Sequence, residues 1–306
     1  MKETNRIFRV MAICVLALAT GTGSLTLSQS KTPACADKDR GKYIDIHVHA
    51  SACSEEGFTL EKLAGWMEAN NVERCIVQQL SSTMPRNAVE RKILIENYRK
   101  FQGKIYGFCV IFARNVTSKE EVVALLTKRK AEGAIGFGEH YGEGLPIDDP
   151  KNMILYGACA EVGLPVLFHM DSENNKDTVG LVRLERVLKA HPDCIFIAHA
   201  PGWWNNMANG TCDRLLQKYP NLYGDLSAGS GARAISRDRK FGKAFLIRNA
   251  DKLMFGTDIG PWSYAGEPAQ HFALLDSFDL PEEVEDKIYR NNAEEIFSFG
   301  AHGSQE

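Results

Sequence analysis

Two histidines separated by one residue, His47 and His49, close the first β-rich run of the chain, at residues 43–49. Residues two apart in a strand point to the same face, so both imidazoles can reach one metal ion. Asp45 shares that face, and the alternating aliphatic residues present an apolar face to whatever packs behind them. A pair of this kind also arises by chance, so its meaning depends on the rest of the chain.

Acidic or imidazole side chains recur at the ends of later apolar runs, at Glu139, His169, His199 and Asp258. Imidazole and carboxylate ligands together suit zinc and its first-row neighbours, whereas oxygen ligands alone would suit calcium or magnesium. Any one of these histidines by itself would be read as a hydrogen-bonded core residue. As a set they predict a site for one or two divalent transition-metal ions, with Zn²⁺ favoured.

The β-rich runs that carry these side chains are evenly spaced along the chain. Their starts are about 30 residues apart, which is the length of a βαβ unit. The segments between them have helical patterns, such as the apolar spacing of Leu181, Leu184, Val187 and Leu188. The runs begin near Ile44, Arg74, Ile105, Ile135, Pro165, Ile195, Leu222 and Leu253, and the predicted helices span residues 59–70, 85–100, 118–132, 150–161, 178–190, 211–218, 237–249 and 281–297.

Eight β/α repeats in series predict a (β/α)₈ TIM barrel in one α/β domain, for which about 250 residues is typical. An open doubly wound sheet is the alternative fold. It would usually carry a glycine-rich phosphate loop after its first strand, where this chain has His-x-His-Ala-Ser-Ala. In a barrel the active site forms at the carboxyl ends of the strands, so we expect the metal-binding side chains to meet at one rim.

The composition is that of a soluble globular protein, with 306 residues, 44% hydrophobic and 25% charged residues. A net charge of −3 indicates neither a nucleic acid nor an acidic membrane surface as partner. The eight cysteines include no Cys-x-x-Cys pair, which excludes a recognisable zinc ribbon or redox motif. We expect a small-molecule substrate, and the composition suits a monomer or a homo-oligomer equally.

The first 36 residues have the features of an export signal. Lys2, Arg6 and Arg9 form a basic start, an apolar run follows at residues 10–19, and a small polar tract ends at Ala36. The apolar run is shorter than the roughly 20 residues that a membrane span needs. We therefore predict a leader at 1–36, a barrel domain at 37–306, and a periplasmic or extracellular protein. A lipoprotein attached through Cys35 is the less favoured alternative.

Four motifs place the chain near a known group of enzymes: Asp-Ile-His-Val-His at 45–49, Gly-Leu-Pro-Val-Leu-Phe-His at 163–169, Ile-Ala-His-Ala at 197–200 and Phe-Gly-Thr-Asp at 255–258. With them the chain resembles the amidohydrolase superfamily, and within it the amidohydrolase-related type 2 branch of metal-dependent hydrolases and decarboxylases. The resemblance covers roughly residues 42–299. It is specific for superfamily and fold and much less so for substrate.

The resemblance implies roles for the site residues. His47, His49 and His169 would bind a divalent metal, usually zinc, and Asp258 would be a ligand or a proton shuttle. His199 would bind a second metal, or polarise the substrate in a site with one metal. A carboxylate in the position of Asp258 can take a proton from water and deliver it to a leaving group.

Glu139 stands where members with two metals often have a bridging carboxylated lysine or glutamate. It could bridge two metals, complete a site with one metal, or hydrogen-bond the substrate. Asp225 and Ser227 end the seventh predicted strand with a spacing of two and are candidates to hydrogen-bond the metal ligands.

Three further residues are candidates for substrate binding. Trp203 follows His199 and Trp262 follows Asp258, so both loops could bring an aromatic ring to the rim. Arg233 lies in the predicted loop after the seventh strand and could bind a substrate carboxylate. The alternatives are aromatics that pack their own loops and an ordinary surface arginine.

The leading hypothesis for function is a metal-dependent hydrolase that activates water against a small ester, lactone or amide. The second is a metal-dependent, non-oxidative decarboxylase of an aromatic or unsaturated acid, which would use the same ligands without consuming water. A non-catalytic extracellular metal-binding protein is less favoured, because a purely structural zinc site is closed. A nuclease is disfavoured by the acidic net charge.

Overall fold

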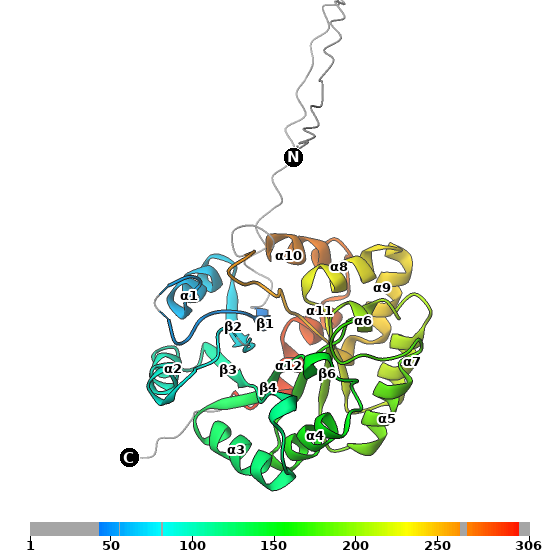
Figure 1. Ribbon diagram of the computed structural model, residues 1–306. Coiled ribbons are helices and arrows are strands. Elements are labelled where there is room, and N and C mark those ends of the chain that lie inside the picture. Colours follow the sequence, from blue (N-terminus) through cyan, green and yellow to red (C-terminus); the bar gives the residue numbers. More distant parts are fainter. Residues whose placement is uncertain (1–42, 55, 81, 264–267, 300–306) are drawn as a thin grey trace, which may run out of the picture. The chain divides into compact units, whose positions relative to one another are not determined.

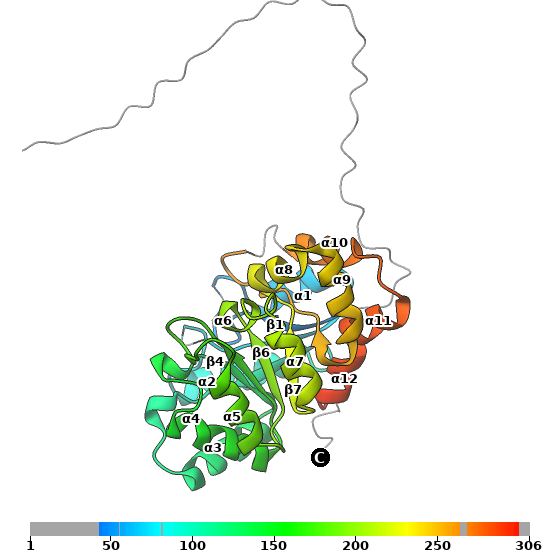
Figure 2. The same ribbon diagram turned by 90° about the vertical axis from the view of Figure 1, so that its right-hand side faces the viewer.

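Eight strands, each parallel to the next, form one sheet in the order β1 to β8. The computed structural model describes residues 43–299 except 55, 81 and 264–267. Within them helices alternate with the strands and surround them, as Figure 1 shows along the ring of strands and Figure 2 from the side. The leader predicted at residues 1–36, with Cys35, lies outside the described residues and stays a prediction.

The strands begin within two residues of the predicted starts. They are β1 (Tyr43–Val48), β2 (Val72–Val77), β3 (Ile105–Cys109), β4 (Ala134–His140), β5 (Val166–His169), β6 (Phe196–His199), β7 (Leu222–Asp225) and β8 (Leu253–Met254). The helices are α1 (Leu60–Ala69), α2 (Ala88–Lys100), α3 (Lys119–Ala131), α4 (Pro150–Val162), α5 (Val182–Ala190), α6 (Pro201–Trp204), α7 (Thr211–Lys218), α8 (Ala228–Ser236), α9 (Arg239–Arg248), α10 (Pro268–Asp276), α11 (Glu282–Asp286) and α12 (Asn292–Ile296).

Backbone hydrogen bonds close the sheet between its first and last strands. The amide of Ile46 donates to the carbonyl of Phe255 over 3.1 Å, and the amide of Asp258 donates to the carbonyl of His47 over 2.8 Å. Because β8 is short, the segment that follows it makes most of this seam. The predicted single-domain (β/α)₈ barrel is confirmed, and the seam brings Asp258 directly beside β1.

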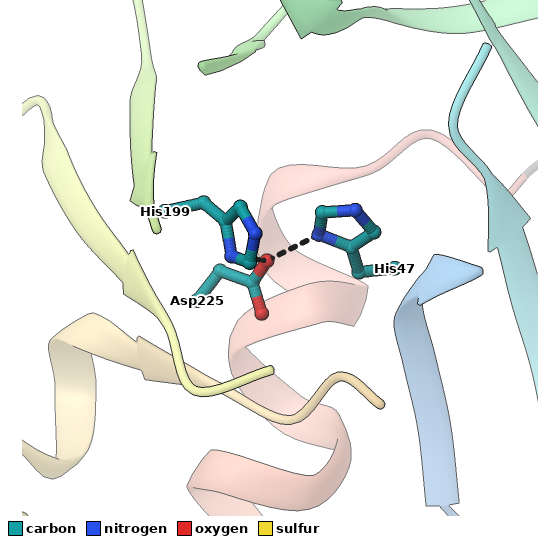
Figure 3. A group of neighbouring side chains, drawn as sticks. All are labelled: His47, His199 and Asp225. Atoms are coloured by element: carbon teal, nitrogen blue, oxygen red, sulfur yellow. Dashed lines mark hydrogen bonds and ion pairs between the residues drawn. The ribbon is translucent and has the colours of Figure 1, made fainter. Parts of the chain in front are cut away.

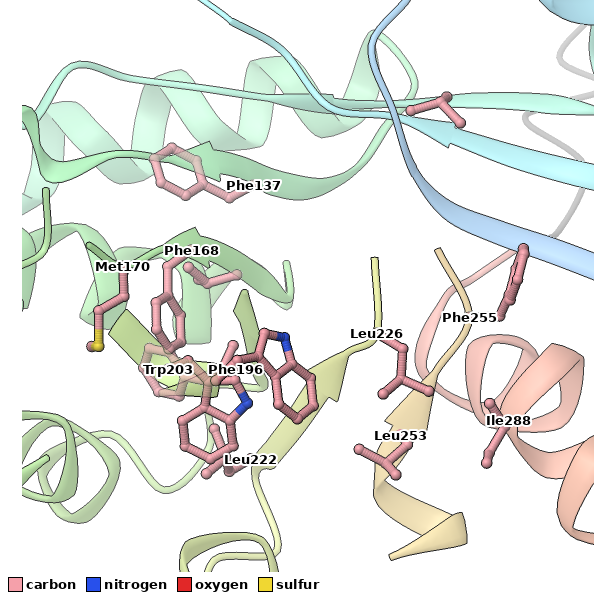
Figure 4. Close-up of a cluster of buried hydrophobic side chains, with 14 of the residues drawn as sticks. Phe137, Phe168, Met170, Phe196, Trp203, Leu222, Leu226, Leu253, Phe255 and Ile288 are labelled. Atoms are coloured by element: carbon pink, nitrogen blue, oxygen red, sulfur yellow. The ribbon is translucent and has the colours of Figure 1, made fainter. Parts of the chain in front are cut away.

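Two apolar cores hold the barrel together. The first draws on all eight strands, so it fills the interior, and Ala293 and Phe297 at α12 close its amino-terminal end. The second lies between the strands and the surrounding helices and contains Phe168, Phe196 and Trp203 (Figure 4). In β1 the expected alternation of an apolar face and a metal-binding face does not hold along the whole strand. Ile44 belongs to the interior core but Val48 to the outer one, because the strand register shifts between Asp45 and Val48.

Side-chain caps mark the starts of α1, α2, α3, α4 and α9. The Asn87 side chain accepts from the amides of Val89 and Glu90, so α2 begins after Asn87 and not at Pro85 as predicted. The helix predicted from residue 178 begins at Val182, because Gly180 and Leu181 adopt positive φ angles of 86° and 58°.

Three helices were not predicted: α6, α8 and α10. They occupy segments that the sequence pattern assigned to loops after strands 6, 7 and 8. None of the helices within the described residues is long and apolar enough to cross a bilayer.

Candidate active site

The six side chains predicted to bind metal or carry protons meet at the carboxyl-terminal rim of the barrel. Their strands place them there: His47 is near the end of β1, His49 directly follows β1, and Glu139, His169 and His199 lie in the last two residues of β4, β5 and β6. Asp258 follows β8 and is brought in by the closing seam. The structure thus brings the six predicted residues together.

His47 and His49 form the first of two groups of donor atoms, called here half-site one. Their Nε2 atoms are 3.0 Å apart. Oε2 of Glu139 lies 3.6 Å from Nε2 of His47 and 3.4 Å from Nε2 of His49. Oδ1 of Asp258 lies 3.6 Å and 3.1 Å from the same two nitrogens. Two imidazoles and two carboxylate oxygens therefore converge on one point.

His169 and His199 form the second group, half-site two, with the other oxygens of the same two carboxylates. Oε1 of Glu139 lies 2.7 Å from Nδ1 of His169 and 3.7 Å from Nε2 of His199. Oδ2 of Asp258 lies 3.9 Å from Nε2 of His199. Glu139 and Asp258 thus each direct one oxygen to each half-site.

The donor atoms fit a divalent transition metal. A tetrahedral ion with ligand bonds of about 2.0–2.1 Å holds neighbouring donors about 3.3 Å apart. The distances around half-site one run from 3.0 to 3.6 Å and bracket that value. Mixed imidazole and carboxylate donors suit zinc, manganese and related ions. The groups His47–His49–Glu139 and Glu139–His169–His199 are both compact enough to hold an ion.

Asp225, at the end of β7, contacts two of these histidines on the side away from the donor atoms. Its Oδ2 accepts from Nδ1 of His47 over 2.6 Å and lies 3.2 Å from Nδ1 of His199 (Figure 3). The Ser227 hydroxyl donates to the same oxygen over 2.8 Å. With the proton on Nδ1, the Nε2 lone pairs of both rings point into the site.

The other two histidines have partners that the sequence analysis missed. Nδ1 of His49 donates to the backbone carbonyl of Gln78 over 3.1 Å, which leaves Nε2 as the donor to a metal. Nε2 of His169 donates to Oδ2 of Asp171 over 2.9 Å, which leaves Nδ1 facing Glu139. A backbone carbonyl leaves no trace in the sequence, but the spacing of His169 and Asp171 repeats that of Asp225 and Ser227 and could have signalled the pair.

The buried carboxylates give the site a strong preference for positive charge. Burial by itself would lower the pKa of His47, yet the surrounding carboxylates raise this pKa well above its ordinary range. Burial likewise opposes the ionisation of Glu139, but the neighbouring histidines hold its pKa well below the usual range. Without metal His47 therefore retains a second proton, which a divalent ion would have to displace.

Asn175 fixes the backbone behind two of the site residues. Its side-chain amide donates to the carbonyl of His140 over 2.7 Å and to the carbonyl of His169 over 2.9 Å. Asn175 is fully buried and has a φ of 44°, a conformation that asparagine tolerates better than most residues. The ends of β4 and β5 are thereby tied to each other beside Glu139 and His169.

Two aromatic rings flank the donor atoms. Tyr141, which the sequence analysis missed, stacks on the ring of His169 with centroids 4.4 Å apart and planes 16° apart. Trp262 lies 5.3 Å from the ring of His49 and is 61% exposed, so it stands at the mouth of the site as predicted. Burial and the nearby charge of Glu139 raise the pKa of Tyr141, so its hydroxyl stays protonated.

One prediction for substrate binding does not agree with the structure, and a second residue lies on a different element than predicted. Trp203 is fully buried in the outer core, where it packs with outward-facing residues such as Phe168 and Phe196, so it cannot reach a substrate at the rim. Arg233 is on helix α8 instead of a loop, is exposed, and its guanidinium lies beside Gly229. The unpredicted helix α6 carries Trp203 into the outer core, and a substrate-binding role for Arg233 stays a prediction.

The model of the amidohydrolase 2 family matches residues 84–299, more than half of the chain. The chain belongs to this family. The chain is therefore a metal-dependent enzyme of the amidohydrolase 2 family, and its buried His, Asp and Glu side chains are suited to hold a divalent metal ion. None of the curated proteins matches the chain.

Solved structures with the same barrel include both reaction types. A probable 2-pyrone-4,6-dicarboxylic acid hydrolase from Acinetobacter baumannii, with citric acid bound, has a TM-score of 0.59 at 14% identity over 85% of this chain and 100% of its own. The 5-carboxyvanillate decarboxylase from Novosphingobium aromaticivorans, with manganese and a nitrobenzoic acid, has a TM-score of 0.57 at 13% identity over 85% and 99%. A 2,6-dihydroxybenzoate decarboxylase from Rhizobium has a TM-score of 0.54 at 14% identity over 84% and 98%. At these identities the likeness establishes the fold alone.

Proposed function

We propose that this member of the amidohydrolase 2 family is a hydrolase that uses two divalent metal ions, with zinc favoured, to open a small ester, lactone or amide. The observation that carries the proposal is the position of Glu139, whose two oxygens face different half-sites at 3.4 Å from Nε2 of His49 and 2.7 Å from Nδ1 of His169. A carboxylate between two groups of imidazoles is the arrangement that binds a pair of ions. Paired ions are used in hydrolytic sites, where they stabilise the attacking and leaving oxygens together.

The residues that would hold the ions are those described above. His47 and His49 bind at half-site one, His169 and His199 at half-site two, and Glu139 lies between them. Divalent ions at these positions supply Lewis acidity toward a carbonyl oxygen and make water acidic enough to lose a proton near neutral pH. The partners on the far side of each ring keep the correct nitrogen free for the ion.

Asp258 is the proton carrier in this proposal. Its side chain is 22% exposed, whereas that of Glu139 is only 1% exposed, so Asp258 faces the incoming water and substrate. The histidines around it hold the pKa of Asp258 below its usual range in spite of burial, so the carboxylate is ionised and able to accept a proton. It takes the proton from the attacking water and gives it to the leaving oxygen or nitrogen.

Tyr141 and Trp262 would form the walls of the substrate site. The two rings lie over His169 and His49, on opposite half-sites, and Trp262 is largely exposed. Aromatic faces favour a flat or apolar substrate body. The protonated hydroxyl of Tyr141 can donate to a substrate oxygen, which suits an uncharged ester or lactone.

A metal-dependent decarboxylase of an aromatic acid is the second candidate. It is supported by the decarboxylases among the structurally similar enzymes, one of which has manganese and a nitrobenzoic acid bound. In that reaction the same residues would orient a carboxylate, and Asp258 would accept a proton from solvent and deliver it to the ring carbon that loses CO₂. A purely structural metal site is disfavoured because Asp258 leaves the site open to solvent.

The products distinguish the two reactions. We would measure the bound metal in the purified protein and then supply a panel of lactones, esters, amides and aromatic acids. The proposal expects one acid released for each substrate consumed, no CO₂, loss of turnover after chelation and its recovery with Zn²⁺ or Mn²⁺. Release of CO₂ from an aromatic acid, with no turnover of any ester, lactone or amide, would establish the decarboxylase instead.

We also propose that the enzyme is exported, with residues 1–36 removed as a signal. The support is the basic start, the apolar run at residues 10–19 and the small residues before position 37. Mass spectrometry of the protein from its native host tests this. An intact Met1 on cytoplasmic protein refutes export, and a lipid on Cys35 would establish the lipoprotein alternative.

A further inference from the structure

We infer that Asp225 is a positioning residue shared by both half-sites, so that this one carboxylate sets the affinity for both metal ions. Asp171, in contrast, serves half-site two alone. The inference rests on the two-ion arrangement of the proposed function but not on the reaction that the enzyme catalyses.

The first step is that Asp225 reaches one histidine in each half-site. Its Oδ2 lies 2.6 Å from Nδ1 of His47, which belongs to half-site one, and 3.2 Å from Nδ1 of His199, which belongs to half-site two. The two imidazole rings are themselves only 4.4 Å apart. A single oxygen thus lies beside the Nδ1 atoms of both rings, where it favours a proton on that nitrogen in each of them (Figure 3).

The second step is that Asp225 is held too tightly to serve one ring at the expense of the other. Its Oδ1 accepts from the amide of Ser227 over 2.9 Å, and its backbone carbonyl accepts from Nε1 of Trp204 over 3.0 Å. The Ser227 hydroxyl, which donates its one proton to Oδ2, also lies 3.2 Å from Nδ1 of His47 and 3.1 Å from Nδ1 of His199. The pair Asp225–Ser227 is therefore a rigid acceptor for two N–H groups.

The third step excludes Asp225 as a metal ligand in its own right. His47, His199 and Asp225 do form a compact group of possible ligands. However, Asp225 contacts the Nδ1 atoms of both rings, whereas the Nε2 atoms of the same rings face Glu139 and Asp258 and are the ones free for an ion. Asp225 is also fully buried, on the far side of both rings from Glu139 and Asp258.

The fourth step is the contrast with the remaining partners. Asp171 contacts His169 alone among the four site histidines, over 2.9 Å, and its own carboxylate is oriented by the amides of Glu173 and Asn174. His49 is held by a backbone carbonyl, which a side-chain substitution leaves in place. The chain therefore offers one variant that should weaken both ions, Asp225→Asn, and one that should weaken a single ion, Asp171→Asn.

The test is a Zn²⁺ titration of the full-length, chelator-stripped protein in competition with a chromophoric chelator, which reports the number of ions and each affinity. For the wild type we expect two ions. For Asp225→Asn we expect both affinities to fall by about 10–100-fold, the usual effect of losing a partner behind a metal ligand. For Asp171→Asn we expect a fall of that size for one ion and a change under about twofold for the other.

Controls separate a positioning role from a general loss of structure. Asp279 is 98% exposed, so Asp279→Asn should leave both affinities unchanged. The unfolding midpoint of each metal-free variant shows whether it folds. Should Asp225→Asn fail to fold, Ser227→Ala removes the hydroxyl next to both Nδ1 atoms and should weaken both ions in the same direction.

The outcomes are distinct. Suppose that the wild type binds two ions. If Asp225→Asn or Ser227→Ala then lowers the affinity for only one of them, or for neither, the inference is overturned. Fewer than two ions in the wild type refutes the two-ion arrangement and the inference with it. If Asp225→Asn lowers the affinity for both ions but the protein opens no ester, lactone or amide, the inference is supported and the proposed reaction is refuted.

Discussion

The buried imidazole of His140 makes the stability of the barrel depend on pH in a calculable way. His140 follows Glu139, is 1% exposed, and donates from Nε2 to the side-chain oxygen of Asn152 over 3.0 Å. The rings of Phe137 and Tyr156 lie 5.4 Å and 5.7 Å from its own. Burial in this apolar surrounding lowers the pKa of His140 from 6.5 to about 4.

Protonation of His140 favours the unfolded state. Between pH 6.5 and about 4 the unfolded chain takes up a proton at His140 and the folded chain does not. The stability contributed by the neutral imidazole is therefore complete above pH 6.5 and is lost as the pH falls through this window. At about 1.36 kcal/mol for each unit of pH, the loss amounts to about 3 kcal/mol by pH 4.

The perturbation is His140→Gln, which removes the titrating group and leaves every metal-binding residue in place. At pH 7.5 the variant should be less stable than the wild type, because a buried hydrogen bond and close packing are lost. Urea unfolding of both metal-free proteins from pH 7.5 to 4.5 should show this gap narrowing by about 2.5 kcal/mol, since all other titrations are common to both. His191→Gln, at a histidine that is only partly buried, is the matched control and should show a smaller change. A gap that stays constant or widens toward acid pH would refute the assignment of a neutral, buried His140.

Three further predictions concern the metal site. Asp258→Asn keeps the shape of the side chain but removes the base, so kcat on the substrate identified should fall about 10²–10⁴-fold while part of the metal is retained. Near-normal turnover would show that another group carries the proton. His47→Ala with His49→Ala should strip the metal and abolish activity while circular dichroism shows the barrel folded, and full metal occupancy measured by mass spectrometry would contradict the assignment of these ligands. Gly256→Ala would place a Cβ 2.7 Å from a buried carboxylate oxygen and 3.1 Å from the Cβ of His47. The thermal unfolding midpoint should therefore drop by the equivalent of about 1–3 kcal/mol of stability. An unchanged midpoint would count against the close packing behind the site.

The fold and the identity of the donor set could be predicted from the sequence because both depend on local patterns. Evenly spaced β-rich runs fix the number of β/α units, and each strand carries its last side chain to the same rim. His169 and His199 needed only to end their strands to be brought together, and β5 and β6 pair them directly in the sheet. The outcome was thus independent of the details of packing.

Residues that act through contacts with distant parts of the chain could not be predicted in this way. Gln78 holds His49 with a backbone carbonyl, and Tyr141 stacks on His169 from a turn whose conformation no periodicity describes. Trp203 was misjudged because the short helix α6, which carries it into the outer core, forms in a segment that was predicted to be a loop.

What the sequence by itself determined is the barrel and the set of side chains at its rim, because a periodic pattern specifies elements and their ends. Only the tertiary structure decided how those side chains divide. The two oxygens of Glu139 face different pairs of histidines, and Asp225 serves one histidine of each pair. Such divisions depend on distances of about 3 Å between side chains from five different strands, and hydrogen bonds weaken steeply beyond that range. A linear pattern carries no information at that scale, so the arrangement appears only when the strands close into a ring.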